Sequence, residues 1–321
     1  MNEDLRWLAA AAAIAARARP LSRPNPGVGA IVVRDGRVVS RGWTQAGGRP
    51  HAEAVALERA GAAARGATLY VTLEPCAHVS NRGPACADLV CAAGLARVVI
   101  GCGDPDPRTA GAGIERIRLA GIACDLVPSP ECEESLSGYL VRARTGRPEV
   151  TLKLAMSLDG CIALSSGESQ WITGPQARAH THAMRARADA ILVGGGTLRT
   201  DSPRLDVRLP GLEDRSPQRW VLTRGAAPPG WQALASPDGI LQMPGIQYLF
   251  VEGGAETAAA FLRASLVDRL LIYRAPILIG AGRPAVRDFG LGALADAHER
   301  WRLTDRRQLG SDTLEVYSSQ V

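Results

Sequence analysis

The chain has 321 residues, 46% of them hydrophobic and 21% charged, an ordinary composition for a protein with a sizeable core, and this length favours two domains. The formal charge of +5 suits anionic partners such as phosphates. Aromatic residues make up only 4%, which argues against a surface that stacks single-stranded nucleic acid, so we expect no nucleic-acid partner.

The N-terminal residues predict an amphipathic helix. Leu5, Leu8, Ala12 and Ala15 fall on one helical stripe. Acidic residues precede this stripe, where a signal peptide would carry positive charge. No apolar run approaches the roughly 18 residues that a membrane span needs. We therefore expect a cytoplasmic protein with no membrane partner.

Residues 28–127 predict strands that alternate with helices. Two β-branched runs on either side of Asp35-Gly36 predict a hairpin over 28–43. The segments that follow are helices over 52–63, 85–93 and 112–120, and strands over 67–73, 96–102 and 122–127. This alternation indicates an α/β domain whose sheet is largely parallel after the hairpin.

A domain boundary is predicted where the composition changes. A helix over 131–144 leads into the stretch TGRPE, so we expect domains over 1–146 and 147–321. The second domain is again α/β, with strands over 150–156, 190–193, 219–223, 247–251 and 268–273, and helices over 175–188 and 255–264. Thr173 is a plausible N-cap for the first of these helices. Residues 225–246, rich in Pro, Gly and Ala, are predicted to be irregular.

The clearest chemistry lies at two anchors, His51-Ala52-Glu53 and Pro75-Cys76, with Cys86 ten residues further on. One imidazole and two thiolates make three protein ligands for Zn²⁺, and a catalytic zinc keeps its fourth position for water. A carboxylate that is not a ligand can then move protons, and Glu53 is placed for this role. Zinc nucleobase deaminases share the His-x-Glu pattern, but their Cys-x-x-Cys would need a cysteine at Val79.

Several polar residues in this region have alternative interpretations. His78 is a rival zinc ligand, and Glu74 could be a structural carboxylate at the strand end. Seven cysteines in one long chain favour metal binding or buried thiols over disulfides. Five of them lie in apolar stretches of the sequence and are interpreted as small core residues: Cys91, Cys102, Cys124, Cys132 and Cys161.

The second half contains no G-x-G-x-x-G, so a Rossmann nicotinamide site is not supported. Two glycine-rich turns that open helices, 194–196 and 253–254, could still admit the phosphates of a dinucleotide, because free N–H groups favour anions there. A glycine pair after a strand is also common as a close-packed turn. The turns alone therefore leave both interpretations open.

Motifs in order over almost the whole chain resemble the bifunctional deaminase/reductase family of riboflavin biosynthesis. The first half carries NPGVG (25–29), HAE (51–53), TLEPCAH (72–78) and GPAC (83–86). The second half carries LKLAMSLDG (152–160), GESQWITG (167–174), MRARADAILVGGGT (184–197), DSPRLDVR (201–208) and FVEGG (250–254). This set is much more specific than the zinc pattern alone.

The resemblance implies two consecutive reactions. An N-terminal, cytidine-deaminase-like zinc domain would deaminate a diaminopyrimidine that carries a phosphoribosylamino group. A C-terminal, dihydrofolate-reductase-like domain would then reduce the ribosyl group to ribityl with NADPH. In this family's pattern His51, Cys76 and Cys86 bind Zn²⁺, Glu53 is the proton donor and Asn25 lies at the pyrimidine pocket.

The resemblance also assigns the second site. It implies NADPH contacts for Ala155, Trp171, Thr197, Asp201 and Gly254. It implies contacts with the phosphoribosyl substrate for Ser169, Arg185, Leu205, Arg208 and Glu252. Arginines suit a phosphate because they offer bidentate donors. Since short reductase-like domains commonly pair, we expect a homo-oligomer, with a dimer as the first hypothesis.

Two departures from the family pattern leave alternatives open. The loop over 79–85 is one residue longer than expected, and only 43 residues separate Arg208 from Glu252, where we expect several dozen more. One alternative is a deaminase whose reductase half is altered or inactive. Another is an RNA-editing deaminase, which the missing Cys-x-x-Cys opposes. A third is a non-catalytic zinc or nucleotide-binding module, which Glu53 opposes.

Overall fold

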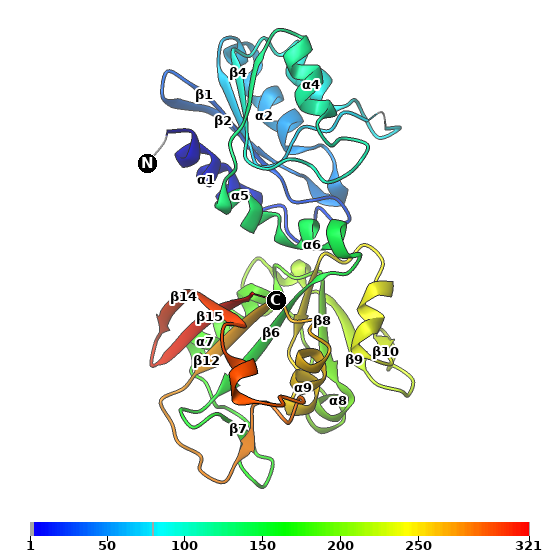
Figure 1. Cartoon of the computed structure of the whole chain (residues 1–321), viewed down its shortest axis with the longest axis vertical. Helices are drawn as coiled ribbons and strands as arrows, with labels where there is room; N and C mark the ends of the chain where they lie inside the picture. Colours follow the sequence, from blue (N-terminus) through cyan, green and yellow to red (C-terminus); the bar gives the residue numbers. More distant parts are fainter. Residues whose placement is uncertain (1–2, 79, 321) are drawn as a thin grey trace. The chain divides into compact units, whose positions relative to one another are not determined.

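The computed structural model describes residues 3–78 and 80–320 and divides the chain into two compact units, 1–146 and 147–321 (Figure 1). Each unit contains its own sheet and its own hydrophobic core. Among the described residues, the helices are too short or too polar for any of them to cross a membrane.

The first unit is built on a five-stranded sheet with strand order β2-β1-β3-β4-β5. Its strands are β1 (Gly29–Arg34), β2 (Arg37–Trp43), β3 (Thr68–Val71), β4 (Arg97–Ile100) and β5 (Ala123–Leu126). β1 runs antiparallel to β2 and β3, and β3, β4 and β5 are parallel. Asp35 and Gly36 both have positive φ, as the tight hairpin turn requires. The predicted hairpin and parallel sheet are confirmed.

Helices cover both faces of this sheet (Figure 1). They are α1 (Glu3–Ala15), α2 (Ala52–Ala60), α3 (Cys86–Ala92), α4 (Ala112–Leu119), α5 (Pro130–Ser135) and α6 (Ser137–Thr145). Along β1, Ala30 and Val32 join the core with α2, α3 and α4, while Ile31 and Val33 join the core with α1 and α5. This alternation places the strand between two apolar layers.

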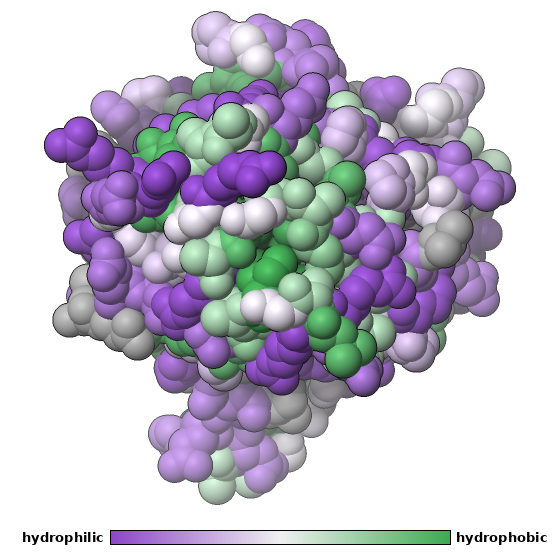
Figure 2. Space-filling view, turned by 90° about the horizontal axis from the view of Figure 1, so that it is seen from above, coloured by the Kyte–Doolittle hydropathy of each residue, from purple (hydrophilic) through white to green (hydrophobic). Residues whose placement is uncertain are grey.

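Glycine allows the helices to lie close to the sheet. A Cβ at Gly29 would meet the Ala11 carbonyl oxygen at 2.0 Å, and one at Gly42 would meet the Ala52 carbonyl oxygen at 2.2 Å. Any side chain at these positions would push α1 or α2 away. In Figure 2, one face of this unit shows hydrophobic residues near the centre with hydrophilic residues around them.

The single helix predicted over 131–144 is wrong in one respect. The structure has two helices there, α5 and α6, with a break at Leu136. Leu136 leaves helical backbone angles (φ −105°, ψ 3°), and its side chain is fully buried in the core. The break therefore occurs at a core residue, and the helical pattern of the sequence does not reveal it.

The second unit is built on an eight-stranded mixed sheet with order β10-β9-β8-β11-β6-β12-β15-β14. Its strands are β6 (Glu149–Met156), β8 (Ala190–Gly194), β9 (Gln218–Leu222), β10 (Gln232–Leu234), β11 (Tyr248–Val251), β12 (Arg269–Arg274), β14 (Trp301–Leu309) and β15 (Asp312–Ser319). β15 pairs antiparallel with β12 and β14, and the other pairs are parallel. β7 (Cys161–Ala163) and β13 (Arg283–Pro284) form a small separate ribbon.

In the described part of the chain, the α-helices that accompany this sheet are α7 (Pro175–Arg185), α8 (Gly195–Asp201) and α9 (Ala255–Arg263). α9 contributes to the core on one face, and α7 to the core on the other. Thr173 is not the N-cap of α7: Gly174 is, and its N–H donates to Asp312 Oδ2 at 2.6 Å. The segment 225–246 is also more ordered than predicted, since it contains β10 and a 3₁₀ turn over Pro237–Gln242.

Candidate active sites

Two helix starts and one strand end build the first site. His51 is the N-cap of α2, which puts Glu53 in the first turn of that helix. Cys76 follows the end of β3, and Cys86 is the first residue of α3. The strand–helix alternation of this unit therefore brings the two sequence anchors to one place.

The ligand atoms of His51, Cys76 and Cys86 lie within 4.8 Å of one another. His51 Nδ1 is 3.3 Å from Cys86 Sγ and 3.6 Å from Cys76 Sγ, and the Cys86 N–H donates to Cys76 Sγ at 3.3 Å. Hydrogen bonds from Cys86 and His51 lower the pKa of Cys76, and the neighbouring thiolate raises the pKa of Cys86. One nitrogen and two sulfurs, one of them readily ionised, form a donor set that fits zinc.

Glu53 lies beside this cluster and is only 3% exposed. Burial raises the pKa of its carboxyl to about 7, against the opposing effect of the nearby His51 ring. A group with this pKa exchanges protons readily at neutral pH, as a general acid or base must. Its environment suits the proton-transfer role predicted for it.

Asn25 contacts the second ring nitrogen of His51. Its Nδ2 is 3.2 Å from His51 Nε2 and donates to the Gly48 carbonyl at 3.1 Å. The predicted place of Asn25 at the pyrimidine pocket stays a prediction, and the structure places its side chain against the His51 ring.

The rival residues near the cluster have other partners. His78 Nδ1 is 3.4 Å from Thr109 Oγ1, and within residues 3–78 and 80–320 the metal-type grouping around Cys76 does not include it. Glu74 is structural, because its carboxylate accepts N–H bonds at the start of α4 from Gly111, Gly113 and Ile114 at 2.9–3.2 Å. Val79 lies outside the described residues.

All seven cysteines are free thiols, as expected from the absence of a disulfide pattern. The five interpreted as core residues lie outside the metal-type cluster. Four of these are buried and Cys91 is half-buried.

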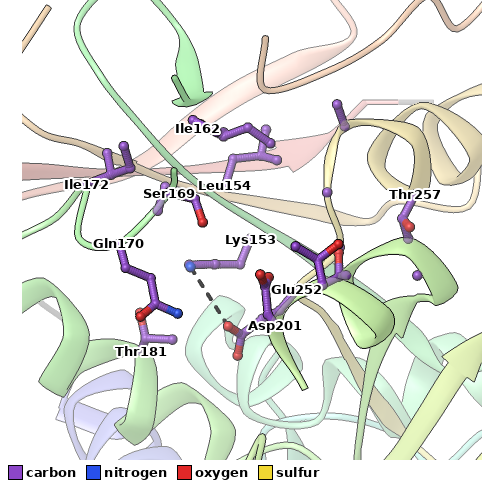
Figure 3. A pocket seen from close by; sticks show the side chains of 18 of the residues that line it. Lys153, Leu154, Ile162, Ser169, Gln170, Ile172, Thr181, Asp201, Glu252 and Thr257 are labelled. Carbon is purple, nitrogen blue, oxygen red and sulfur yellow. Dashed lines mark ion pairs between the residues drawn. The ribbon is translucent and has the colours of Figure 1, made fainter. Parts of the chain in front are cut away.

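The second site is a cavity of about 1010 Å³ between β6, α7, α8 and the turn after β11 (Figure 3). Nine of the ten residues predicted for the reductase site line it: Ala155, Ser169, Trp171, Arg185, Thr197, Asp201, Arg208, Glu252 and Gly254. Leu205 is the exception, because its side chain is 4% exposed and packs in the core with Val193 and Phe250. Its side chain is not brought to the cavity, so its assignment stays a prediction.

A cluster of charged side chains with little exposed surface lines this cavity. Arg185 Nε and Nη2 donate to the two Glu252 carboxylate oxygens at 2.6 and 3.0 Å, and Lys153 Nζ is 3.8 Å from Glu252 (Figure 3). Burial opposes ionisation of Glu252, but the charges of Arg185 and Lys153 prevail and lower its pKa. Burial lowers the pKa of Lys153, and Glu252 offsets this only in part. Arg185 therefore orients Glu252 and has few donors left for a substrate phosphate.

Each glycine-rich turn contains one packed and one open glycine. A Cβ at Gly194 or Gly253 would meet Thr257 at 2.2 or 2.3 Å. A Cβ at Gly196 would meet no described residue within 4 Å, and one at Gly254 would meet Thr197 Oγ1 at 3.5 Å. The close-packed interpretation therefore holds for Gly194 and Gly253, and the phosphate-binding interpretation stays a prediction.

Sequence reasoning missed several lining residues, including Thr257, His182, Arg283 and Arg287. Lys153 does carry a signal in the sequence, because it is a charged residue on a strand whose other face is apolar. For Arg283 and Arg287 the sequence carries no comparable signal, since Arg283 lies in the two-residue strand β13 and Arg287 in the irregular chain after it.

Family models match both halves of the chain. Residues 1–102 match the cytidine and deoxycytidylate deaminase zinc-binding region, and residues 148–236 and 239–314 match the RibD C-terminal domain. The riboflavin biosynthesis protein RibD of Escherichia coli K12 is 39% identical over 361 aligned positions, which cover 97% of this chain and 98% of that protein. The RibD of Mycobacterium tuberculosis H37Rv is 38% identical over 308 positions, covering 91% and 90%.

Solved structures agree in fold over the whole length. RibD from Acinetobacter baumannii, form 1, superposes with a TM-score of 0.88 at 33% identity and covers 99% of both chains. A diaminohydroxyphosphoribosylaminopyrimidine deaminase/5-amino-6-(5-phosphoribosylamino)uracil reductase from Thermotoga maritima gives a TM-score of 0.87 at 30% identity and covers 98% of both. The predicted fold class, a cytidine-deaminase-like domain followed by a reductase domain, is confirmed.

The E. coli alignment has 361 positions against the 321 residues of this chain, so that relative carries insertions. That they fall between Arg208 and Glu252 stays a prediction. The alternative of a decayed reductase half gains no support, because the reductase model matches across this region.

Proposed function

This chain belongs to the RibD family of riboflavin-biosynthesis enzymes, which are bifunctional deaminases and reductases, and from this premise we propose the substrates and residues of each reaction. The first unit hydrolytically deaminates 2,5-diamino-6-(5-phosphoribosylamino)pyrimidin-4-one. The second reduces the ribosyl side chain of the product, 5-amino-6-(5-phosphoribosylamino)uracil, to ribityl. The Thermotoga relative is named for this pair of activities. The observation that best supports this proposal is the His51–Cys76–Cys86 cluster with the buried Glu53 beside it.

In the first unit, His51, Cys76 and Cys86 hold the zinc ion that the family's deaminase domain uses. When bound by three protein ligands, zinc supplies a water of lowered pKa at its open position. The Glu53 carboxylate takes a proton from the attacking water and gives a proton to the amino group that leaves as ammonia. Asn25, whose side chain lies beside the His51 ring, borders the pyrimidine.

In the second unit, NADPH supplies the hydride, and the chain binds and orients the two reactants. The open glycines 196 and 254 admit the cofactor backbone next to Ala155, Thr197 and Asp201. Glu252, oriented by Arg185, accepts hydrogen bonds from the sugar hydroxyls together with Ser169. Arg208, whose side chain is 53% exposed, meets the substrate phosphate.

The test uses the purified full chain with its bound zinc quantified. Given the diaminopyrimidine substrate, it should release one ammonia per substrate with or without NADPH, and should oxidise NADPH only after deamination. Supplying the deaminated product directly should start NADPH oxidation without a lag. Ammonia release with no NADPH oxidation from either substrate would reject the second half of the proposal.

We also expect a cytoplasmic location and a homo-oligomer, with a dimer as the simplest form. Seven free thiols support a reducing compartment. The second unit exposes large apolar side chains such as Leu278 (76%) and Leu294 (77%), which suit an interface between copies. Light scattering of the purified chain measures its mass directly, and a monomer at micromolar concentration would reject the oligomer.

A further inference from the structure

Helix α7 holds the segment 206–208 through two side chains one turn apart. The backbone N–H of Arg208 donates to His182 Nδ1 at 3.2 Å, and Arg185 Nη1 donates to the Asp206 carbonyl at 3.0 Å. Residues three apart lie on the same face of a helix, so the two bonds act together. The segment lies outside the strands and helices, and a further contact is the Val207 N–H, which donates to Ser216 Oγ at 3.0 Å.

The position of this segment determines where the Arg208 guanidinium can reach. Arg208 lines the reductase cavity, and its ion pair with Asp206 spans 3.4 Å. A long, half-exposed side chain loses conformational entropy when it binds a ligand. If the backbone of Arg208 is held in place before the ligand binds, the side chain has fewer conformations to lose, and the entropic cost of binding is lower.

The hydrogen bond from Arg208 also fixes the tautomer of His182. Because Nδ1 accepts an N–H, the neutral ring carries its proton on Nε2. Burial and the charges of Arg185 and Arg208 lower the pKa of His182, while Glu252 and the Asp206 carbonyl raise it. Protonation would place a hydrogen on Nδ1, facing the Arg208 N–H, and would remove the acceptor.

We propose that His182 is a positioning residue for the reductase, which in its neutral form holds the Arg208 segment at the phosphoribosyl end of the cavity and releases it when protonated. The inference rests on the proposed function, because it assumes that Arg208 meets the substrate phosphate. It predicts an effect on the KM for the phosphoribosyl substrate, with little change in kcat or in the KM for NADPH.

The test compares His182→Ala and His182→Asn in the full chain, supplied with the deaminated substrate at saturating NADPH from about pH 5.5 to 8. Loss of one such hydrogen bond should raise the KM of His182→Ala about five- to tenfold at pH 8. Asparagine places an uncharged oxygen near the position of Nδ1, so His182→Asn should retain a KM near that of the wild type at pH 8. Toward acid pH the wild-type KM should rise more steeply than that of His182→Asn.

His180→Asn is the matched control on the same helix. His180 Nδ1 is 2.8 Å from the Tyr273 hydroxyl, and its charged neighbours are Arg187, Arg307 and Asp305 instead. This variant should show the same dependence of KM on pH as the wild type. That dependence includes any contribution from protonation of the substrate phosphate.

Three results would overturn the inference. If His182→Asn follows the wild-type pH profile, another group titrates. If the wild-type KM falls toward acid pH, His182 binds the phosphate directly as a cation. If His182→Ala binds substrate normally, the hydrogen bond positions nothing. A wild-type chain that oxidises no NADPH at any pH would overturn the proposed function, which is a different failure and is visible before any variant is made.

Discussion

Each candidate site contains a buried glutamate, and the two have opposite electrostatic settings. Glu53 is 3% exposed beside a cluster of thiols, and its pKa rises to about 7 because burial dominates. The Glu252 side chain is 9% exposed between Arg185 and Lys153, and its pKa is lowered because these cations outweigh burial. The first environment suits proton transfer, and the second keeps a permanent acceptor for hydrogen bonds.

The two sites also differ in how their residues are spread along the chain. The first draws its metal-type ligands and Glu53 from residues 51–86, whereas the second is lined by residues from 153 to 287. A zinc site needs a few donor atoms at fixed short distances, while a dinucleotide and a sugar phosphate need an extended surface. Single substitutions should therefore abolish the first activity more completely than the second.

The largest effect is expected for Cys86→Ala. Removing one of three sulfur and nitrogen donors should prevent stoichiometric zinc binding and abolish ammonia release, while NADPH oxidation with the deaminated substrate persists. Cys91→Ala is the control, because Cys91 lies outside the metal-type cluster and should keep full zinc. Zinc is measured by atomic spectroscopy on the purified chain. Normal zinc in Cys86→Ala, with loss in His78→Ala, would contradict the ligand assignment.

Glu53→Gln tests the proton-transfer role with the metal in place. We expect ammonia release to fall about 10²- to 10⁴-fold, the usual contribution of a general acid–base group, with zinc content unchanged. Because no Lys or Arg ion pair with Glu53 is present among the described residues, the neutral amide should not lower the thermal stability of the first unit. A variant with full activity would reject the mechanism.

Glu252→Gln should behave in the opposite way. Removing this carboxylate leaves Arg185 and Lys153 buried without their partner, at a cost of about 3 kcal/mol of unfolding free energy. We expect a lower unfolding temperature for the second unit and slower NADPH oxidation, while zinc content and ammonia release stay intact. Calorimetry of both glutamine variants measures this contrast directly, and equal stability changes would invalidate it.

Local sequence signals account for much of the fold and for the first site. Asp35-Gly36 can adopt the positive φ values of a tight turn, so the hairpin is predictable from two residues. The zinc-type residues are recognisable because their chemistry restricts both residue type and spacing. Glu53 follows from its position two residues after the histidine.

Features that depend on distant partners could not be predicted. The C-terminal hairpin of β14 and β15 is mostly exposed along β14, so it lacks the apolar alternation that marks a half-buried strand. The residues around Glu74 in the sequence do not indicate that its carboxylate oxygens accept hydrogen bonds from backbone N–H groups at the start of α4. The bond between Arg185 and Glu252 joins residues 67 positions apart, and only the folded sheet reveals it.

The smallest expected effect concerns Asp4. It tests whether an ion pair with a cation lowers the pKa of a carboxylate in the first unit as it does in the second. Asp4 in the first unit accepts two hydrogen bonds from Arg97 at 2.8 and 3.0 Å and one from the Tyr70 hydroxyl at 3.0 Å. The Arg97 bonds lower its pKa, as the Arg185 and Lys153 charges do for Glu252. Asp4→Asn should therefore cost about 1 kcal/mol at pH 7.

The pH dependence follows from the sign of this shift. A carboxyl whose pKa is lower in the folded state contributes stability above its unfolded value of roughly 3.9 and loses it as the pH falls through the folded value. The wild type and Asp4→Asn should therefore differ in unfolding temperature at neutral pH and converge as the pH falls below the folded-state pKa of Asp4. Asp125→Asn, which removes the more exposed partner of Arg97, should have a smaller effect. If the gap for Asp4→Asn stays constant down to acid pH, the bonds to Arg97 do not stabilise the ionised form, and the parallel with Glu252 fails.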